Sequence, residues 1–160
     1  MAKVILESLN KVFTSKIGND VKAVNNFNLL LEDGEILALL GSSGCGKTTT
    51  LRMIAGFETA SSGQIKIGER IVNDLKPAER NVAMAFEGYA LYPPLTVRDN
   101  IAFSLMREKI SKEKVDSKVM EVAELLEITD ILERYPPSIS GGQQQRVSLA
   151  RALVRDSDAL

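Results

Sequence analysis

The segment from Gly41 to Thr48, GSSGCGKT, constrains this chain more than any other feature. It fits G-x-x-x-x-G-K-[S/T] at every fixed position. The apolar run Glu35–Leu40 precedes it and predicts a buried strand, while Lys47–Ala55 predicts a helix that Gly56 ends. Glycines let consecutive N–H groups converge on one anion at the positive end of that helix. The pattern therefore predicts a phosphate-binding loop, against the alternative of a Gly-Ser turn with an incidental lysine.

The remaining periodicity predicts an α/β chain. Apolar and β-branched residues predict strands, and apolar residues at helical spacing after Thr, Ser or Asp predict helices. The expected strands are Lys3–Phe13, Val21–Leu31, a hairpin of Gln64–Ile67 with Ile71–Val72, Asn81–Phe86, and a strand beginning at Asp158–Leu160. The expected helices are Val97–Met106 with Thr96 and Asp99 at its start, a helix opened by Ser111, and one from Ser140 to about Arg155.

Composition excludes several functional classes. Lys plus Arg number 20 and Asp plus Glu 21, a net charge of −1, so we expect no general nucleic-acid binding. The chain has no histidine, which excludes a His-based triad or a His-ligated zinc, and its one cysteine excludes an intrachain disulfide. The first residues form no secretory signal, and the longest apolar run, Ile36–Leu40, is too short to span a membrane. We expect a cytosolic chain.

The cysteine lies inside the glycine-rich loop. One interpretation of Cys45 is a small filler without a chemical role, which the sequence favours. The sharper hypothesis is that its thiol is reachable and that alkylating it blocks nucleotide binding.

A second candidate motif is Ser140-Gly-Gly-Gln143. Ser-x-x-Gln is a capping box, in which Ser140 caps a helix and Gln143 reaches back to it. Two adjacent glycines at a helix start also leave bare N–H groups that can face an outside anion. The sequence thus predicts a helix start here and permits a second anion site.

With both motifs in view, the chain resembles the ATP-binding subunits of ABC transporters over its whole length. GSSGCGKTT looks like their Walker A motif and ISGGQQQRVSLARAL like their signature helix. ALYPPLTVRDNIAF is similar to a segment of the importer branch that takes sugars, polyols or glycerol phosphate. The resemblance implies a P-loop NTPase core, with a parallel sheet and an antiparallel β subdomain, plus a helical subdomain. It divides the chain into a core over 1–86, a Q-loop and helical subdomain over 87–139, and a signature segment over 140–160.

The same resemblance assigns ATP and Mg²⁺ as ligands. Phe13 falls where the family stacks an aromatic on adenine, although an ordinary strand aromatic is the alternative. Lys47 and Thr48 would contact the phosphates and Mg²⁺, and Glu87 stands where the family usually has a metal-contacting glutamine. The phosphate cradle implied by the resemblance comprises Gly41, Ser42, Ser43, Gly44, Cys45, Gly46, Lys47, Thr48 and Thr49.

The resemblance also implies partners and a location. Ser140, Gly141, Gly142 and Gln143 would bind the ATP held by a second ATPase subunit in a head-to-tail dimer. The segment from Glu87 to Pro94 would contact transmembrane permease subunits, with an ordinary Pro-rich turn as the alternative. The chain would then lie at the cytoplasmic face of the membrane.

Several family elements lie beyond the signature helix, namely the Walker B strand, the catalytic glutamate and the switch histidine. The sequence ends at Leu160, where that strand would begin. We therefore expect the 160-residue chain alone to hydrolyse ATP poorly or not at all.

Three other interpretations of the function remain: a nucleotide-binding fragment without catalysis, an ABC-type ATPase outside transport, and another P-loop class such as a kinase or GTPase. The SGGQ motif disfavours the last.

Overall fold

The computed structural model describes residues 2–14, 18–86, 88–106 and 110–160, and forms two compact units. The first unit comprises residues up to 82 together with 157–159, and the second comprises 83–156 with residue 160. The predicted division at 86 and 139 concerns functional segments and stays a prediction. No helix in the described part of the chain is long and apolar enough to cross a bilayer.

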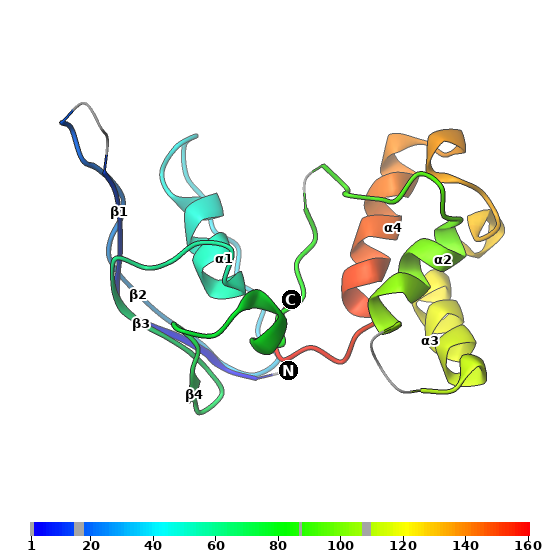
Figure 1. The fold of residues 1–160 in the computed structure, drawn as a ribbon, viewed down its shortest axis with the longest axis horizontal. Coiled ribbons are helices and arrows are strands. Elements are labelled where there is room, and N and C mark those ends of the chain that lie inside the picture. Colours follow the sequence, from blue (N-terminus) through cyan, green and yellow to red (C-terminus); the bar gives the residue numbers. More distant parts are fainter. Residues whose placement is uncertain (1, 15–17, 87, 107–109) are drawn as a thin grey trace. The chain divides into compact units, whose positions relative to one another are not determined.

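The first unit is built on a four-stranded antiparallel sheet, visible with its labels in Figure 1. The strands are β1 (Val4–Phe13), β2 (Val21–Leu31), β3 (Ser62–Ile67) and β4 (Arg70–Ile71), in the order β2-β1-β3-β4. Alternating residues of β1 and β3 are buried, as expected for a sheet with one covered face. The buried residues include Leu6, Leu9, Met53 and Ile65. The predicted N-terminal strands and the hairpin are confirmed.

Helix α1 (Lys47–Ala55) belongs to this unit and has the predicted bounds. It begins after Gly46 and ends at Gly56, and both glycines adopt left-handed backbone angles. The Gly56 N–H bonds to the Met53 carbonyl, which closes the last turn.

Two predicted strands are wrong in this structure. Glu35–Leu40 has no strand assignment, and Ile36 and Leu40 are 99% and 90% exposed. Asn81–Phe86 forms no strand either, apart from one parallel bridge between Val82 and Ala159. A strand needs hydrogen-bonding neighbours, and neither segment finds a ladder among the described residues. The strand predicted to begin at Asp158–Leu160 is present only as this one bridge at Ala159.

The second unit is helical. It contains α2 (Val97–Ala102), α3 (Lys112–Leu125) and α4 (Gly141–Leu153), with short 3₁₀ turns at Phe103–Leu105, Thr129–Ile131 and Pro136–Ser138; the single turn Pro77–Glu79 lies in the first unit. Thr96, Ser111 and Ser140 cap the three α-helices, as their positions predicted. The predicted helix to Met106 ends early, because its last residues tighten into a 3₁₀ turn. Val97, Ile101, Val119 and Val147 lie in a shared apolar core.

A buried arginine fixes the end of α1. The side chain of Arg80 is 3% exposed and donates hydrogen bonds to four backbone carbonyls, those of Met53, Ile54, Asn73 and Leu75. Burial lowers the pKa of Arg80 from its ordinary value, yet a guanidinium stays charged at neutral pH. The charge is therefore compensated by the carbonyls at the helix C-terminus, where a cation is favourable.

We expect Arg80→Met to reduce the free energy of unfolding by about 3 kcal/mol, because it leaves several buried carbonyls without donors. Chemical denaturation measures this loss. Arg70→Met is the matched control, since Arg70 is exposed and makes one bond to the Glu79 carbonyl, and it should cost less than about 0.5 kcal/mol. Equal losses for the two variants would contradict this role of Arg80.

Candidate nucleotide-binding site

The loop from Gly41 to Gly46 leads into α1, whose start has no side-chain cap. Gly46 is the N-cap residue, and no side chain accepts a hydrogen bond there. The first N–H groups of any α-helix have no partner within the helix, so this end of α1 can receive an anion. Gly41, Gly44 and Gly46 all have positive φ angles, which permit the loop to wrap around such an anion.

Gly46 is required by packing as well as by its backbone angle. Its φ is 95°, and a Cβ built there would lie 2.2 Å from the carbonyl oxygen of Ala23 on β2. No L-residue side chain fits at that distance. The loop is thus pressed directly against the sheet, which fixes where α1 begins.

The side chain of Lys47 folds back over the loop. Its Nζ donates to the carbonyl oxygens of Gly41 and Ser42, each at 2.8 Å, and lies 3.5 Å from the Cys45 sulfur. The Lys47 ammonium group therefore lies against the backbone of the same loop that leads into α1. An arriving phosphate would meet both the ammonium group and the free N–H groups.

The other predicted loop residues lie around this cradle. Ser42, Ser43 and Thr48 are exposed, whereas Thr49 is half-buried. Cys45 is exposed as well, so its thiol is reachable, while its effect on nucleotide binding stays a prediction. Thr50, which the motif does not include, is buried and donates its hydroxyl to the Gly46 carbonyl at 3.0 Å.

Phe13 lies at the end of β1 in the same unit, with 41% of its surface exposed. The ammonium of Lys11 lies 4.8 Å from its ring centroid. This cation–π contact occupies one face of the ring. The half-exposed ring can therefore still offer apolar surface to a ligand.

The second motif lies at the start of α4, in the other unit. The Ser140 hydroxyl accepts from the Gln143 N–H at 3.3 Å, and the Gln143 side chain accepts from the Ser140 N–H at 2.9 Å. The predicted capping box is therefore confirmed. It exists together with the two exposed glycines that follow Ser140.

Packing within the chain does not explain those glycines. Among the residues that the structure describes, a Cβ at Gly142 would meet nothing within 4 Å, and one at Gly141 would meet only the Tyr89 hydroxyl at 3.8 Å. Neither residue has a positive φ. Glycine in a helix costs up to about 1 kcal/mol relative to alanine, so both positions carry a cost without local compensation.

The segment before α2 contains backbone that is rare outside glycine. Tyr89 and Ala90 have φ angles of 59° and 48°. Arg151 of α4 donates to the Ala90 carbonyl, and its guanidinium lies 4.9 Å from the ring centroid of Tyr92. The buried side chain of Asn100 holds the backbone of Tyr92 from both sides, accepting from its N–H and donating to its carbonyl. Glu87, two residues before Tyr89, lies outside the described residues, so its predicted role as a metal ligand stays a sequence prediction.

Sequence reasoning did not find Lys11, Arg80 or Arg151. Each has at least one partner that is more than 25 residues away along the chain, namely Met53 for Arg80, Glu58 for Lys11 and Ala90 for Arg151. Only the spacing of Lys11, two residues before Phe13 on one strand, gave a local signal.

The ABC transporter family profile matches residues 24–160, a range that includes both motifs. The chain belongs to the ABC transporter family. Its fold agrees, since the dimeric structure of MJ0796, a bacterial ABC transporter cassette, matches with a TM-score of 0.85 at 29% identity. That alignment covers 96% of this chain and 70% of the cassette. The α/β fold class with a P-loop NTPase core is thereby confirmed.

Curated relatives point to one branch of the family. The sn-glycerol-3-phosphate import ATP-binding protein UgpC 3 of Agrobacterium fabrum is 49% identical over 97% of this chain. The trehalose/maltose import ATP-binding protein MalK of Thermococcus litoralis is 52% identical over 97% of it. The matches cover 43% and 42% of these two relatives, so this ABC chain spans less than half of their length. The predicted resemblance to the importer branch is confirmed.

We expect Gly142→Ala to raise the free energy of unfolding by about 0.5 kcal/mol, because the space is open and alanine favours the helix. Urea denaturation of the two proteins tests this. Gly46→Ala is the contrasting variant, and the contact with the Ala23 carbonyl predicts a clear loss of stability. A destabilised Gly142→Ala protein would show that the glycine serves this chain's own packing.

Proposed function

We propose that this chain is the nucleotide-binding part of an ATP-hydrolysing subunit that drives an importer. The observation that carries the proposal is the uncapped start of α1, with the Lys47 ammonium lying over the same loop. A triphosphate matches this arrangement in charge and in hydrogen-bonding capacity. Phe13, in the same unit as the loop, would take the adenine ring on its exposed surface.

The proposed metal is Mg²⁺ that arrives with the nucleotide. No three His, Cys, Asp or Glu side chains gather into a metal site in the described ranges. Mg²⁺ held by phosphates needs only one or two ligands from the protein, and water completes its shell. Thr48, exposed in the first turn of α1, can supply one such oxygen.

The proposed partners are a second ATPase subunit and permease subunits. The cassette MJ0796 is described as dimeric, and also in a post-hydrolysis state bound to ADP and Pi. In a head-to-tail pair, the start of α4 would face the ATP on the partner's loop. This would explain two glycines that the chain's own packing does not require. The segment from Glu87 to Pro94 would contact the permease at the cytoplasmic face of the membrane.

The proposed cargo class is a sugar, polyol or glycerol phosphate. The curated relatives are named for import of glycerol-3-phosphate or trehalose and maltose, and one from Synechocystis for uptake of osmoprotective compounds. Their identities to this chain range only from 49% to 52%. Overall identity to this chain therefore does not separate one cargo from another.

We expect the purified chain to bind MgATP, and Lys47→Ala to weaken that binding at least tenfold, because a charge-assisted contact contributes about 1.5–3 kcal/mol. Isothermal titration calorimetry measures both affinities. Lys112→Ala is the matched control, since Lys112 is also the first residue of a helix but is remote from the loop in sequence. It should leave the affinity unchanged. Binding without turnover would favour a catalytically incomplete fragment, and no binding would overturn the proposal.

A head-to-tail dimer predicts complementation between two inactive variants. Gly142→Asp suits a helix first turn and meets no steric obstacle, but it places a carboxylate where the partner's γ-phosphate would lie. Neither this variant nor Lys47→Ala should dimerise with MgATP alone. Their mixture forms one intact composite site and should dimerise, as measured by analytical ultracentrifugation. A mixture that stays monomeric while the unmodified chain dimerises would contradict the head-to-tail arrangement.

A further inference from the structure

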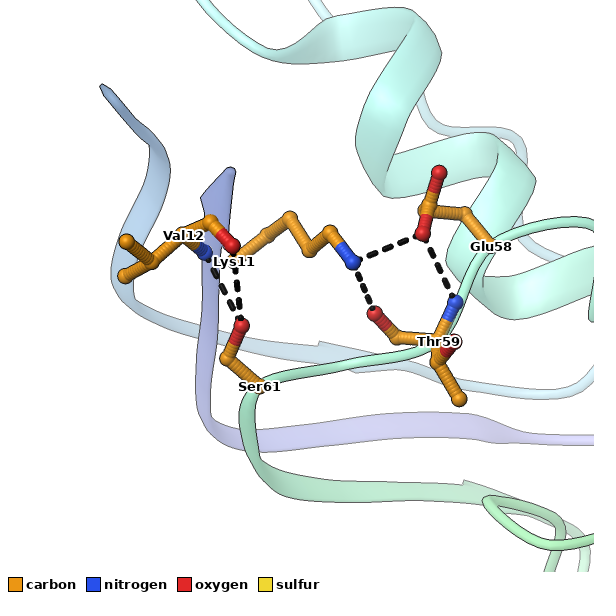
Figure 2. A network of polar contacts seen from close by, with 5 residues as sticks. All are labelled: Lys11, Val12, Glu58, Thr59 and Ser61. Atoms are coloured by element: carbon orange, nitrogen blue, oxygen red, sulfur yellow. Dashed lines mark hydrogen bonds and ion pairs between the residues drawn. The ribbon is translucent and has the colours of Figure 1, made fainter. Parts of the chain in front are cut away.

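A network of polar contacts joins the end of β1 to the segment that follows α1 (Figure 2). The Lys11 ammonium donates to a Glu58 carboxylate oxygen at 2.7 Å and to the Thr59 carbonyl at 2.8 Å. The same Glu58 oxygen also accepts the Thr59 N–H at 3.1 Å. Two residues further on, the Ser61 hydroxyl accepts the Val12 N–H at 3.0 Å. Side chains and backbone thus hold Lys11 and Val12 of β1 to Glu58, Thr59 and Ser61 of the following segment.

This ion pair is better enclosed than a typical surface pair. The side chains of Lys11 and Glu58 are 12% and 27% exposed. The hydrogen bond from Lys11 lowers the pKa of Glu58 below its ordinary value, against the opposing effect of burial, and the Thr59 N–H adds to the lowering. The carboxylate is therefore charged at neutral pH and holds the Lys11 side chain in one orientation.

The constrained ammonium also contacts the aromatic ring. With two donors engaged by Glu58 and Thr59, its position over Phe13 is fixed at 4.8 Å from the ring centroid. Phe13 is the last residue of β1 and is 41% exposed, so the Lys11 contact restrains a ring that lies partly in solvent. If the Phe13 ring were mobile before the base binds, part of the stacking free energy would be spent on ordering the ring.

The partner of Lys11 is itself fixed to the helix that begins at the phosphate loop. The N–H groups of Phe57 and Glu58 both bond to the Arg52 carbonyl of α1, at 2.8 and 3.2 Å. The contacts therefore run from the loop through α1 to Glu58, Lys11 and Phe13. These contacts connect the loop that would hold the phosphates to the Phe13 ring that would hold the base.

We infer that Lys11 is a positioning residue for the nucleotide base, one that holds the Phe13 ring ready to stack on adenine while Glu58 fixes Lys11 to the end of α1. The inference rests on the proposed function. Lys11 need not touch the nucleotide, since it lies against one face of the ring and leaves the other for the base.

The test compares MgATP with magnesium tripolyphosphate, which lacks the base and the ribose. Both are titrated calorimetrically into the unmodified chain, Phe13→Ala, Lys11→Met and Lys11→Arg, with thermal unfolding recorded for each protein. Lys66→Met is the matched control, because Lys66 forms a comparable 3.0 Å ion pair with Glu7 on the same sheet without an aromatic ring contact. Glu58→Gln provides a second way to release Lys11 if the Lys11→Met protein is unstable.

We expect Lys11→Met to weaken MgATP binding about three- to tenfold and to leave tripolyphosphate binding within twofold. Lys11→Arg should restore most of the loss, Glu58→Gln should show part of it, and Lys66→Met none. The inference is overturned if Lys11→Met weakens both ligands equally, or weakens neither while Phe13→Ala still lowers the preference for ATP. If the unmodified chain binds neither ligand, the proposed nucleotide site itself fails. If it binds MgATP and Phe13→Ala has no effect, the proposed role of Phe13 fails while the phosphate site stands. The role of Lys11 fails in both cases.

Discussion

The close contact between Gly46 and the Ala23 carbonyl is the constraint on which the candidate site depends. It brings the backbone of the loop against β2 at a distance that only glycine tolerates, and it sets the point where α1 begins. Because no side chain caps that point, the N–H groups of the first turn remain available to an anion. Gly46, which is required sterically, thus sets the place where α1 begins and also leaves the first N–H groups of the helix without a side-chain cap.

The other end of α1 is held just as firmly. Arg80 binds the last carbonyls of the helix, and Glu58 connects the following residues to Lys11 on β1. A helix of nine residues is about 13 Å long and does not compress. Fixing both ends therefore sets the separation between the loop and the strand end that carries Phe13. A ligand that uses both contacts finds them already spaced, and less of its binding energy is lost in ordering them.

The sequence predicted those elements whose signals are local. The bounds of α1 agree with the prediction because Gly46 and Gly56 start and stop the helix by their own backbone angles. Ser111 and Ser140 act as caps for the same reason, through bonds to residues three positions on. The strand predicted at Glu35–Leu40 is absent because an apolar run indicates only that a segment is suited to a sheet. Whether the segment forms a strand depends on pairing with other strands. Arg80 and Lys11 escaped prediction because each has partners far along the chain: Met53 and Ile54 lie 27 and 26 residues from Arg80, and Glu58 lies 47 residues from Lys11.

The exposed run before the loop bears on the site itself. Ile36 and Leu40 are the most exposed large apolar residues among those the structure describes, and the phosphate loop begins at the residue after Leu40, Gly41. Burying two such side chains is worth about 3–6 kcal/mol, so any strand neighbour that covers this segment gains substantial free energy. The same pairing would restrict the entrance to the loop, whose exit is already fixed at Gly46. A strand that paired with Glu35–Leu40 would therefore also restrain the start of the phosphate loop, because Leu40 is bonded directly to Gly41.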